Sequence, residues 1–192
     1  RSSRGGAGAG HLELCVIAEE MGRANAPVPF SSTVYLAAEA LMLAGSDAQK
    51  QKWLPKIASG EAIGTLALFE GSGNPSAKAI KLQASGGTLN GVKKPVLDGA
   101  IADFAVVAAR TGSTGRDSDI SLFLVDMKAG GVEARALTNV DPTRGQAELT
   151  FKNAKDEPLG AAGEGWGILS QVLDRAAVLL AFEQVGGSDR AL

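Results

Sequence analysis

A helix-to-strand junction at residues 46–70 constrains the fold more than any other part of the sequence. Ser46 and Gln49 form a capping-box pattern, in which each side chain satisfies a free backbone amide, and this predicts a helix over 47–58. After a turn that contains Gly60, the run IGTLALF is short and apolar, which is typical of a buried strand. A chain that changes from helical to extended periodicity here must pack helices against a sheet.

Apolar residues at helical spacing predict two further helices before this junction. Their stripes are Leu14, Ile17, Ala18 and Met21, and then Val34, Ala37, Ala38 and Leu41. In helix 47–58 we expect Trp53, Leu54 and Ile57 to face inward. The runs IGTLALF, DFAVVAAR, ISLFLVD and AELTF are separated by Gly-, Asn- and Ser-containing turns, which predicts an antiparallel β-domain.

A last helical pattern runs to the end of the chain, and we expect a helix over 164–190. Its apolar stripe is Trp166, Leu169, Leu173, Ala176 and Leu180. Such a stripe needs other helices to cover it, so we expect a dimer or tetramer rather than a stable monomer. The predicted fold is therefore α+β: a partial N-terminal helical domain over 1–60, a middle β-domain over 61–161, and the first helix of a C-terminal helical bundle over 162–192.

The composition fits a globular protein and excludes several classes of partner. The 192 residues are 45% hydrophobic and 21% charged, with a net charge of −2, so nothing favours nucleic acid or an anionic membrane. No apolar run approaches the roughly 20 residues of a membrane helix, and no signal-peptide pattern opens the chain. The single Cys15 excludes a disulfide framework and is expected to be a buried thiol in a cytoplasmic protein. The sequence has no Cys or His cluster for a metal.

Several longer runs follow one another in a specific order, namely SDAQKQKWLPKIASGEAIGTLALFE, GTLNGVKKPVLDGAIADFAVVAAR, ISLFLVDMKAGGVE, PLGAAGEGWGILSQVLDR and FEQVGGSDRAL. Over nearly the whole chain, their order resembles the acyl-CoA dehydrogenase family. The resemblance implies FAD-dependent α,β-desaturation of an acyl-CoA thioester, in which a carboxylate removes the α-proton while the β-hydrogen passes as hydride to the flavin. It also implies a homo- or hetero-oligomer of family subunits.

The first flavin motif of the family, L-T-E-P-x-A-G-S-D, aligns with residues 68–76. Phe69 replaces the threonine hydroxyl that donates to the flavin, and Pro75 replaces the serine near the substrate and has no amide hydrogen. Backbone amides over 68–74 remain as donors, and an ordinary polar turn is the alternative. By the resemblance, the FAD-binding positions here are Leu68, Phe69, Glu70, Gly71 and Gly73, and the substrate-binding position is Pro75.

The second motif, G-x-K-x-W-I-T-N-G, falls on GVKKPVLDG. The resemblance implies FAD contacts at Pro95, Val96 and Leu97, where Pro95 replaces the aromatic ring and Leu97 replaces the hydroxyl beside the flavin. Lys93 and Lys94 are expected to be solvated charges at a strand end, with a CoA phosphate contact as the alternative.

The third motif lies on the final helix, where the family has an Asp followed three residues later by an Arg that contacts CoA. Asp174 matches, and Ala177 stands at the arginine position, so the resemblance makes both substrate-binding positions. Some members place the catalytic glutamate one residue earlier, at Ala176 here, and the more common base position lies beyond Leu192. Glu183 is expected to be a partly solvated charge, with a place in the bundle interior as the alternative.

The other polar residues carry weaker signals. We expect His11 to be exposed, and Asp141, Thr143 and Arg144 to form a turn held by Asp and Thr hydrogen bonds, similar to a turn near the subunit contact in shorter family members. The glycines of GGAGAG, at 5–10, are similar to a family loop before a helix, because no strand precedes them.

Four expected flavin contacts are thus replaced, and we expect the isolated chain to bind FAD weakly or not at all. Three functions stay open from the sequence. The chain is an acyl-CoA dehydrogenase, a degenerate subunit that supports an active homologue, or a flavin-free acyl-CoA-binding or structural protein.

Overall fold

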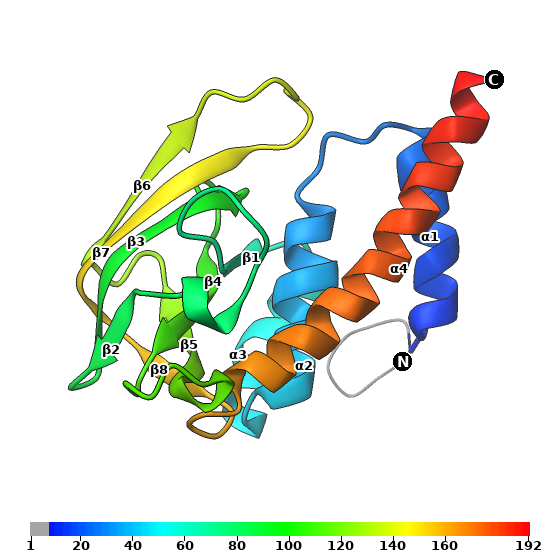
Figure 1. Cartoon of the computed structure of the whole chain (residues 1–192). Helices are drawn as coiled ribbons and strands as arrows, with labels where there is room; N and C mark the ends of the chain where they lie inside the picture. The colour runs from blue at the N-terminus through cyan, green and yellow to red at the C-terminus, as the bar shows by residue number, and fades with distance from the viewer. Residues whose placement is uncertain (1–7) are drawn as a thin grey trace.

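The computed structural model describes residues 8–192, in which helices cover one side of an eight-stranded sheet (Figure 1). The predicted α+β class is confirmed. The helical elements are α1 (His11–Arg23), η1 (Ser31–Ala38), α2 (Glu39–Ala44), α3 (Asp47–Ala58), η2 (Ala77–Ala79), η3 (Asp117–Asp119) and α4 (Gly165–Ala191). The strands are β1 (Gly64–Ala67), β2 (Gln83–Ser85), β3 (Thr88–Leu97), β4 (Phe104–Arg110), β5 (Ile120–Asp126), β6 (Val132–Leu137), β7 (Gln146–Lys155) and β8 (Glu157–Leu159).

Strand β4 is buried on both faces and so contributes to two cores. Successive side chains of a strand point to opposite faces. Phe104, Val106 and Ala108 face the core under the helices, whereas the residues between them face a second core enclosed by β3, β5 and β7. An uninterrupted apolar run is therefore required at this position, which explains the composition of DFAVVAAR.

The sheet order is β6-β7-β3-β2-β4-β5-β8, with β1 beside β4. Most neighbours are antiparallel, but β1 runs parallel to β4, with Gly64 opposite Phe104. Strand β2 also meets β4 in parallel at Gln83 and Arg110. The sheet is thus mainly antiparallel, as predicted, and the parallel pairing of β1 is an addition that the sequence did not indicate. It arises because the β2–β3 hairpin lies between β1 and β4 in the chain and returns β4 in the direction of β1.

Helix α3 begins as its cap pattern predicted and is anchored to the sheet. The Gln49 amide donates to Ser46 Oγ at 3.2 Å, and the Ser46 amide donates to Gln49 Oε1 at 2.9 Å. The same Gln49 side chain donates to Glu157 Oε1 at 2.8 Å, which joins the cap to β8. Trp53 faces inward, as expected, and its ring lies 4.5 Å from that of Phe104.

The first helices differ from their predicted apolar stripes. In α1, Cys15 and Ala18 are buried against η1 and α4, whereas Ile17 is 45% exposed, because α1 turns its small residues toward α4. The expectation of a buried thiol at Cys15 is confirmed. Residues 31–38 form a π-helix, which the spacing of apolar residues did not indicate.

Most of the predicted stripe of α4 is covered within the chain, which corrects the sequence-based expectation, but its last residue, Leu180, is 42% exposed. Leu169 and Ala176 are buried within the chain, and Trp166 and Leu173 pack partly against the main core. The outward apolar strip of α4 is instead Val178, Phe182 and Val185, which are 52%, 37% and 55% exposed.

By length and composition alone, α4 is long and apolar enough to cross a membrane, contrary to the expectation that no apolar run of the sequence approaches that length. One side of α4 lies against α1, η1 and β5. Arg175 of the same helix forms an ion pair with the buried Glu39.

Helices α1 and α4 approach each other through glycines. A Cβ atom on Gly22 would overlap the carbonyl oxygen of Glu183, and one on Gly186 would overlap that of Glu19. By contrast, a Cβ on the adjacent Gly187 would lie 3.6 Å from Gly22 O, an ordinary contact. The close approach therefore depends on Gly22 and Gly186.

We expect Gly186→Ala to lower the free energy of unfolding by about 1–3 kcal/mol, because the methyl group forces two backbones apart. The matched control Gly187→Ala should be neutral or stabilise by about 0.5–1 kcal/mol, since alanine favours helix. Urea denaturation of both variants measures the difference. Equal stability of the two variants would contradict the tight crossing.

Candidate functional site

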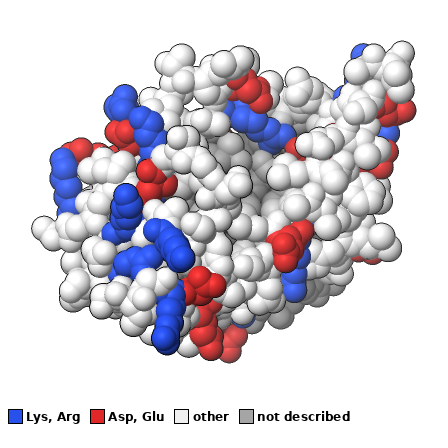
Figure 2. All heavy atoms as spheres, in the orientation of Figure 1, with Lys and Arg blue, Asp and Glu red and all other residues white. Residues whose placement is uncertain are grey.

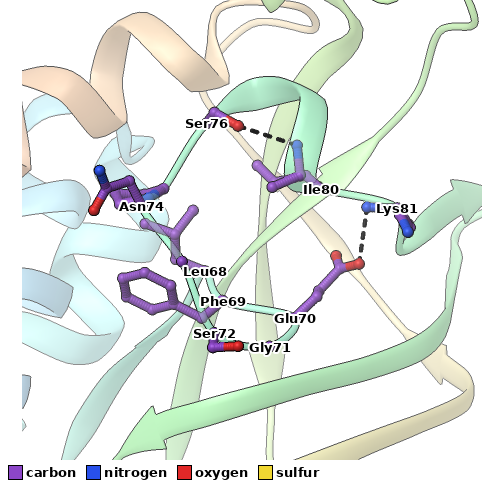
Figure 3. A pocket seen from close by; sticks show the side chains of 12 residues that line it. Leu68, Phe69, Glu70, Gly71, Ser72, Asn74, Ser76, Ile80 and Lys81 are labelled. Carbon is purple, nitrogen blue, oxygen red and sulfur yellow. Dashed lines mark hydrogen bonds between the residues drawn. The ribbon is translucent and has the colours of Figure 1, made fainter.

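The loop after β1 borders an open cavity of about 220 Å³. Residues 68–76 and 79–81 line it (Figure 3). Figure 2 shows the molecular face on which the helices meet the sheet, with a hollow between them and Lys and Arg gathered over the β-domain. The structure therefore brings the six predicted first-motif positions together: Leu68, Phe69, Glu70, Gly71, Gly73 and Pro75.

Glu70 supports this loop from within the protein. Its carboxylate accepts hydrogen bonds from the amides of Lys81, at 2.9 Å, and Leu82, at 3.0 Å, and Figure 3 shows it directed toward Lys81. Lys93 Nζ donates to Glu70 Oε1 at 2.7 Å and to the carbonyl of Leu68 at 3.1 Å. All three donors to Glu70 belong to the chain itself, so we assign the side chain a structural role.

Lys93 is fully buried, which contradicts its expected place as a solvated strand-end charge. Burial lowers the pKa of Lys93 to about 8, and the hydrogen bond that Lys93 donates to the Glu70 carboxylate limits that fall. The ammonium is retained because it satisfies both a carboxylate and a carbonyl in the interior. Lys94 behaves as expected: its side chain is 46% exposed and pairs with Glu148 at 3.2 Å.

The loop offers hydrogen-bond donors through its backbone. Within residues 8–192, the amides of residues 72–74 donate to no protein group. Gly71 and Gly73 have φ values of +145° and +120°, and open space lies where a Cβ atom would be. A polar ligand group can therefore approach the main chain closely.

Side chains at the other flavin positions supply no such donor. Phe69 places a half-buried ring at the cavity, and Pro95 has no N–H. Val96 points into the core enclosed by the strands, and the carbonyl of Leu97 is occupied by Thr65 Oγ1 at 2.5 Å. A reduced flavin is stabilised by donors at its pyrimidine ring, so these side chains do not fit tight flavin binding.

Helix α4 does not bring its predicted positions to this cavity. Asp174 and Ala177 are exposed, and neither lines it. Ala176, at the alternative base position, is buried on another face of the helix, where it packs with Cys15 and Tyr35. The second motif does lie beside the first, since the amide of Lys94 donates to the carbonyl of Phe69 at 2.7 Å.

A buried polar network joins α4 to the β-domain. Glu183 is 7% exposed, so its expected partly solvated position was wrong. Its carboxylate accepts hydrogen bonds from Tyr35 Oη at 3.0 Å and from Arg144 Nη2 at 2.7 Å, and Arg144 Nη1 donates to Ser31 Oγ at 2.9 Å. Burial and the adjacent carboxylate raise the pKa of Tyr35 well above its usual range. The signal in the sequence was spacing: Glu183 follows the buried Ala176 by seven residues, on the same helix face.

Two weaker expectations are confirmed. The side chain of His11 is 54% exposed and lies 3.2 Å from Glu39. The amide and the hydroxyl of Thr143 both donate to Asp141 Oδ1, at 2.9 and 2.6 Å, as the predicted turn requires. The first glycines of GGAGAG lie outside the described residues, and Gly10 is the N-cap of α1.

We expect the Lys93 ammonium to titrate near pH 8 in the folded protein, which NMR of its ¹³Cε can measure. Because the folded-state pKa lies below the ordinary 10.5, the unfolded chain binds more protons between these values. The unfavourable burial is therefore fully present below pH 8 and is relieved as pH rises toward 10.5, so this group's contribution to the free energy of unfolding increases over that window.

Two variants test the cause of this shift. Glu70→Gln should lower the midpoint further, because it removes the carboxylate that favours the ammonium. Glu148→Gln, which removes the partner of the exposed Lys94, should leave the Lys93 midpoint unchanged. A Lys93 midpoint close to 10.5 in the wild-type chain would refute its burial.

Comparisons with known proteins agree with this geometry. Residues 2–61 match the family model "Acyl-CoA dehydrogenase, N-terminal domain", and residues 71–154 match "Acyl-CoA dehydrogenase, middle domain". The mitochondrial isovaleryl-CoA dehydrogenase of Solanum tuberosum is 33% identical, over 95% of this chain and 47% of the relative. The mitochondrial short-chain specific acyl-CoA dehydrogenase of Homo sapiens is 32% identical, over 98% and 48%.

A solved structure, the Tcur3481-Tcur3483 steroid ACAD G363A variant, is 31% identical with a TM-score of 0.81, and the match covers 100% of this chain and 50% of that one. The chain spans about half the length of the curated relatives that it matches. The two family models follow one another in the order of the helices and the sheet described above. The chain belongs to the acyl-CoA dehydrogenase family.

Proposed function

We propose that this chain is a supporting subunit of an acyl-CoA dehydrogenase assembly that desaturates an acyl-CoA thioester with FAD. In this proposal a homologous partner holds the flavin and supplies the base. The proposal rests on the loop at 68–76. The backbone amides of residues 72–74 are free to bind a ligand, but the side chains at the positions that the family uses for flavin are not hydrogen-bond donors.

The preserved scaffold supports a role within an assembly. Glu70 and Lys93 hold the loop in shape although Phe69 and Pro75 lack the donors found in the family motif. Ala176 and Ala177 place methyl groups where the family has a glutamate or an arginine. A chain of this kind keeps the fold that a partner contacts and leaves the chemistry to that partner.

The outward strip of α4, Val178, Phe182 and Val185, is the surface that we assign to this contact. These residues lie at i, i+4 and i+7 and so share one face of the helix. Burying each large apolar side chain stabilises an interface by roughly 1.5–3 kcal/mol. The name of the matched Tcur3481-Tcur3483 steroid ACAD pairs two proteins, which favours a homologous partner by analogy. The single free thiol, Cys15, favours a cytoplasmic location.

We expect the purified chain to bind FAD weakly, and Phe69→Thr with Leu97→Thr to bind it more tightly. Each regained hydrogen bond contributes about 0.5–1.5 kcal/mol, so two bonds raise affinity by roughly one to two orders of magnitude. Titration with FAD, followed by flavin fluorescence, measures both affinities.

The matched control is Val92→Thr. It adds a hydroxyl at an exposed position of β3, the strand that contains Leu97, and should leave FAD affinity unchanged. Stoichiometric, tightly held FAD in the wild-type chain would refute the supporting-subunit role. An unchanged affinity in the folded double variant would place the defect outside these two side chains.

We expect the chain to form a dimer or a larger assembly, and Phe182→Glu to shift it toward monomer, because a buried unpaired charge disfavours the interface. Light scattering measures the molar mass at micromolar concentration. Gln184→Glu adds the same charge at an exposed polar position of α4 and should not change the mass. A wild-type monomer, or a Phe182→Glu variant of unchanged mass, would contradict this interface.

A further inference from the structure

A second cavity, of about 390 Å³, lies where the β2–β3 hairpin approaches β5, β8 and the segment that leads into α4 (Figure 1). It shares no lining residue with the cavity at 68–81. Its volume is within the range of small-molecule sites, about 300–1,000 Å³. It is therefore large enough to hold a ligand of its own.

The walls of this cavity are mostly apolar or small. Leu122, Phe123 and Pro158 form one side, and the glycines of the hairpin tip form another. Gly86 and Gly87 have φ values of +60° and +75°, as the tight turn requires, and no side chain fills the space beside them. The amide of Asp156 donates to the Gly87 carbonyl at 3.2 Å and fastens the tip to the end of β7.

Asp156 is one of the residues that line the same cavity, and its carboxylate lacks a partner among the described residues. Its Oδ2 is inaccessible to solvent, and neither carboxylate oxygen accepts a hydrogen bond from residues 8–192. By contrast, each fully buried acid of that part of the chain accepts a hydrogen bond from a side chain; these acids are Glu39, Asp98, Asp119 and Glu183. Burial without a donor raises the pKa of Asp156.

The hydroxyls of Thr111 and Ser121 also line the cavity, but they are already engaged. They lie 2.9 Å from each other, Thr111 Oγ1 donates to the Asp119 carbonyl at 3.2 Å, and Ser121 Oγ accepts from the Gly163 amide at 2.9 Å. Among the described lining residues there is no Lys, Arg or His. Asp156 is thus the group with unused hydrogen-bonding capacity, and the site disfavours anions such as phosphate.

We propose that this cavity binds a small amine or amidine, with its apolar body against Phe123 and Pro158 and its cationic group at Asp156. An ammonium or amidinium group compensates the cost of a half-buried carboxylate without a partner, and hydrogen bonds that involve an ionised group are stronger than neutral ones. The site does not depend on the flavin positions or on the partner surface of α4.

Benzylamine is the probe, and benzyl alcohol, of nearly the same shape but neutral, is its control. In ¹H–¹⁵N NMR titrations we expect saturable shifts of the Gly87 and Phe123 amides with benzylamine, with a dissociation constant on the order of 1 mM, and weaker or no binding of benzyl alcohol. Asp156→Asn should weaken benzylamine binding by about tenfold or more and keep the fold, because it removes an unpaired charge.

Asp117→Asn makes the same change of charge at an exposed acid of η3 and should leave benzylamine binding unchanged. Absence of saturable shifts with benzylamine would overturn the proposal. Equal binding of benzyl alcohol, or equal binding by Asp156→Asn, would also overturn it, since either result removes the role of the carboxylate.

Discussion

Burial of β4 and β5 on both faces is the constraint on which the rest of this structure depends. One face of each strand closes the core under α2, α3 and α4, and the other closes the core inside the curved sheet. Both cores must therefore form together, because the same strands supply their centres. Strand β1 pairs with β4 along its length, so this arrangement also fixes where the loop that borders the candidate site begins.

In the proposed supporting role, the loop at 68–76 keeps the main-chain shape of a family scaffold while its side chains leave the chemistry to a partner. The buried pair of Lys93 and Glu70 holds the main chain of the loop in place. The loop glycines, Gly71 and Gly73, leave open space through which a ligand can reach the backbone amides. Interactions of this kind stabilise the fold itself, whereas Phe69 borders the cavity and Leu97 stands at a position that only the family resemblance assigns to the flavin. Loss of a donor to a ligand costs the fold little, so the two sets of residues can diverge independently.

Helix α4 is attached to the rest of the chain by two different means. Near Gly186 the attachment depends on close backbone approach, and at Glu183 it depends on charged hydrogen bonds from Tyr35 and Arg144. Both leave the strip at Val178, Phe182 and Val185 exposed among the described residues 8–192. The helix thus has one face packed against its own domain and another that is exposed, and the exposed face is the one that the proposed assembly would cover.

The sequence by itself determined the elements that local chemistry specifies. The cap at Ser46, the apolar strands and the turn at Asp141 all depend on residues that are near neighbours in the chain, and the family motifs located the loop at 68–76. The tertiary structure alone decided the parallel pairing of β1, the burial of Lys93 and Glu183, and the orphaned carboxylate of Asp156. These features depend on groups far apart in sequence, such as Glu70 with Lys93 and Tyr35 with Glu183. The burial and the partners of a charged side chain are properties of the packed chain, and local pattern does not encode them.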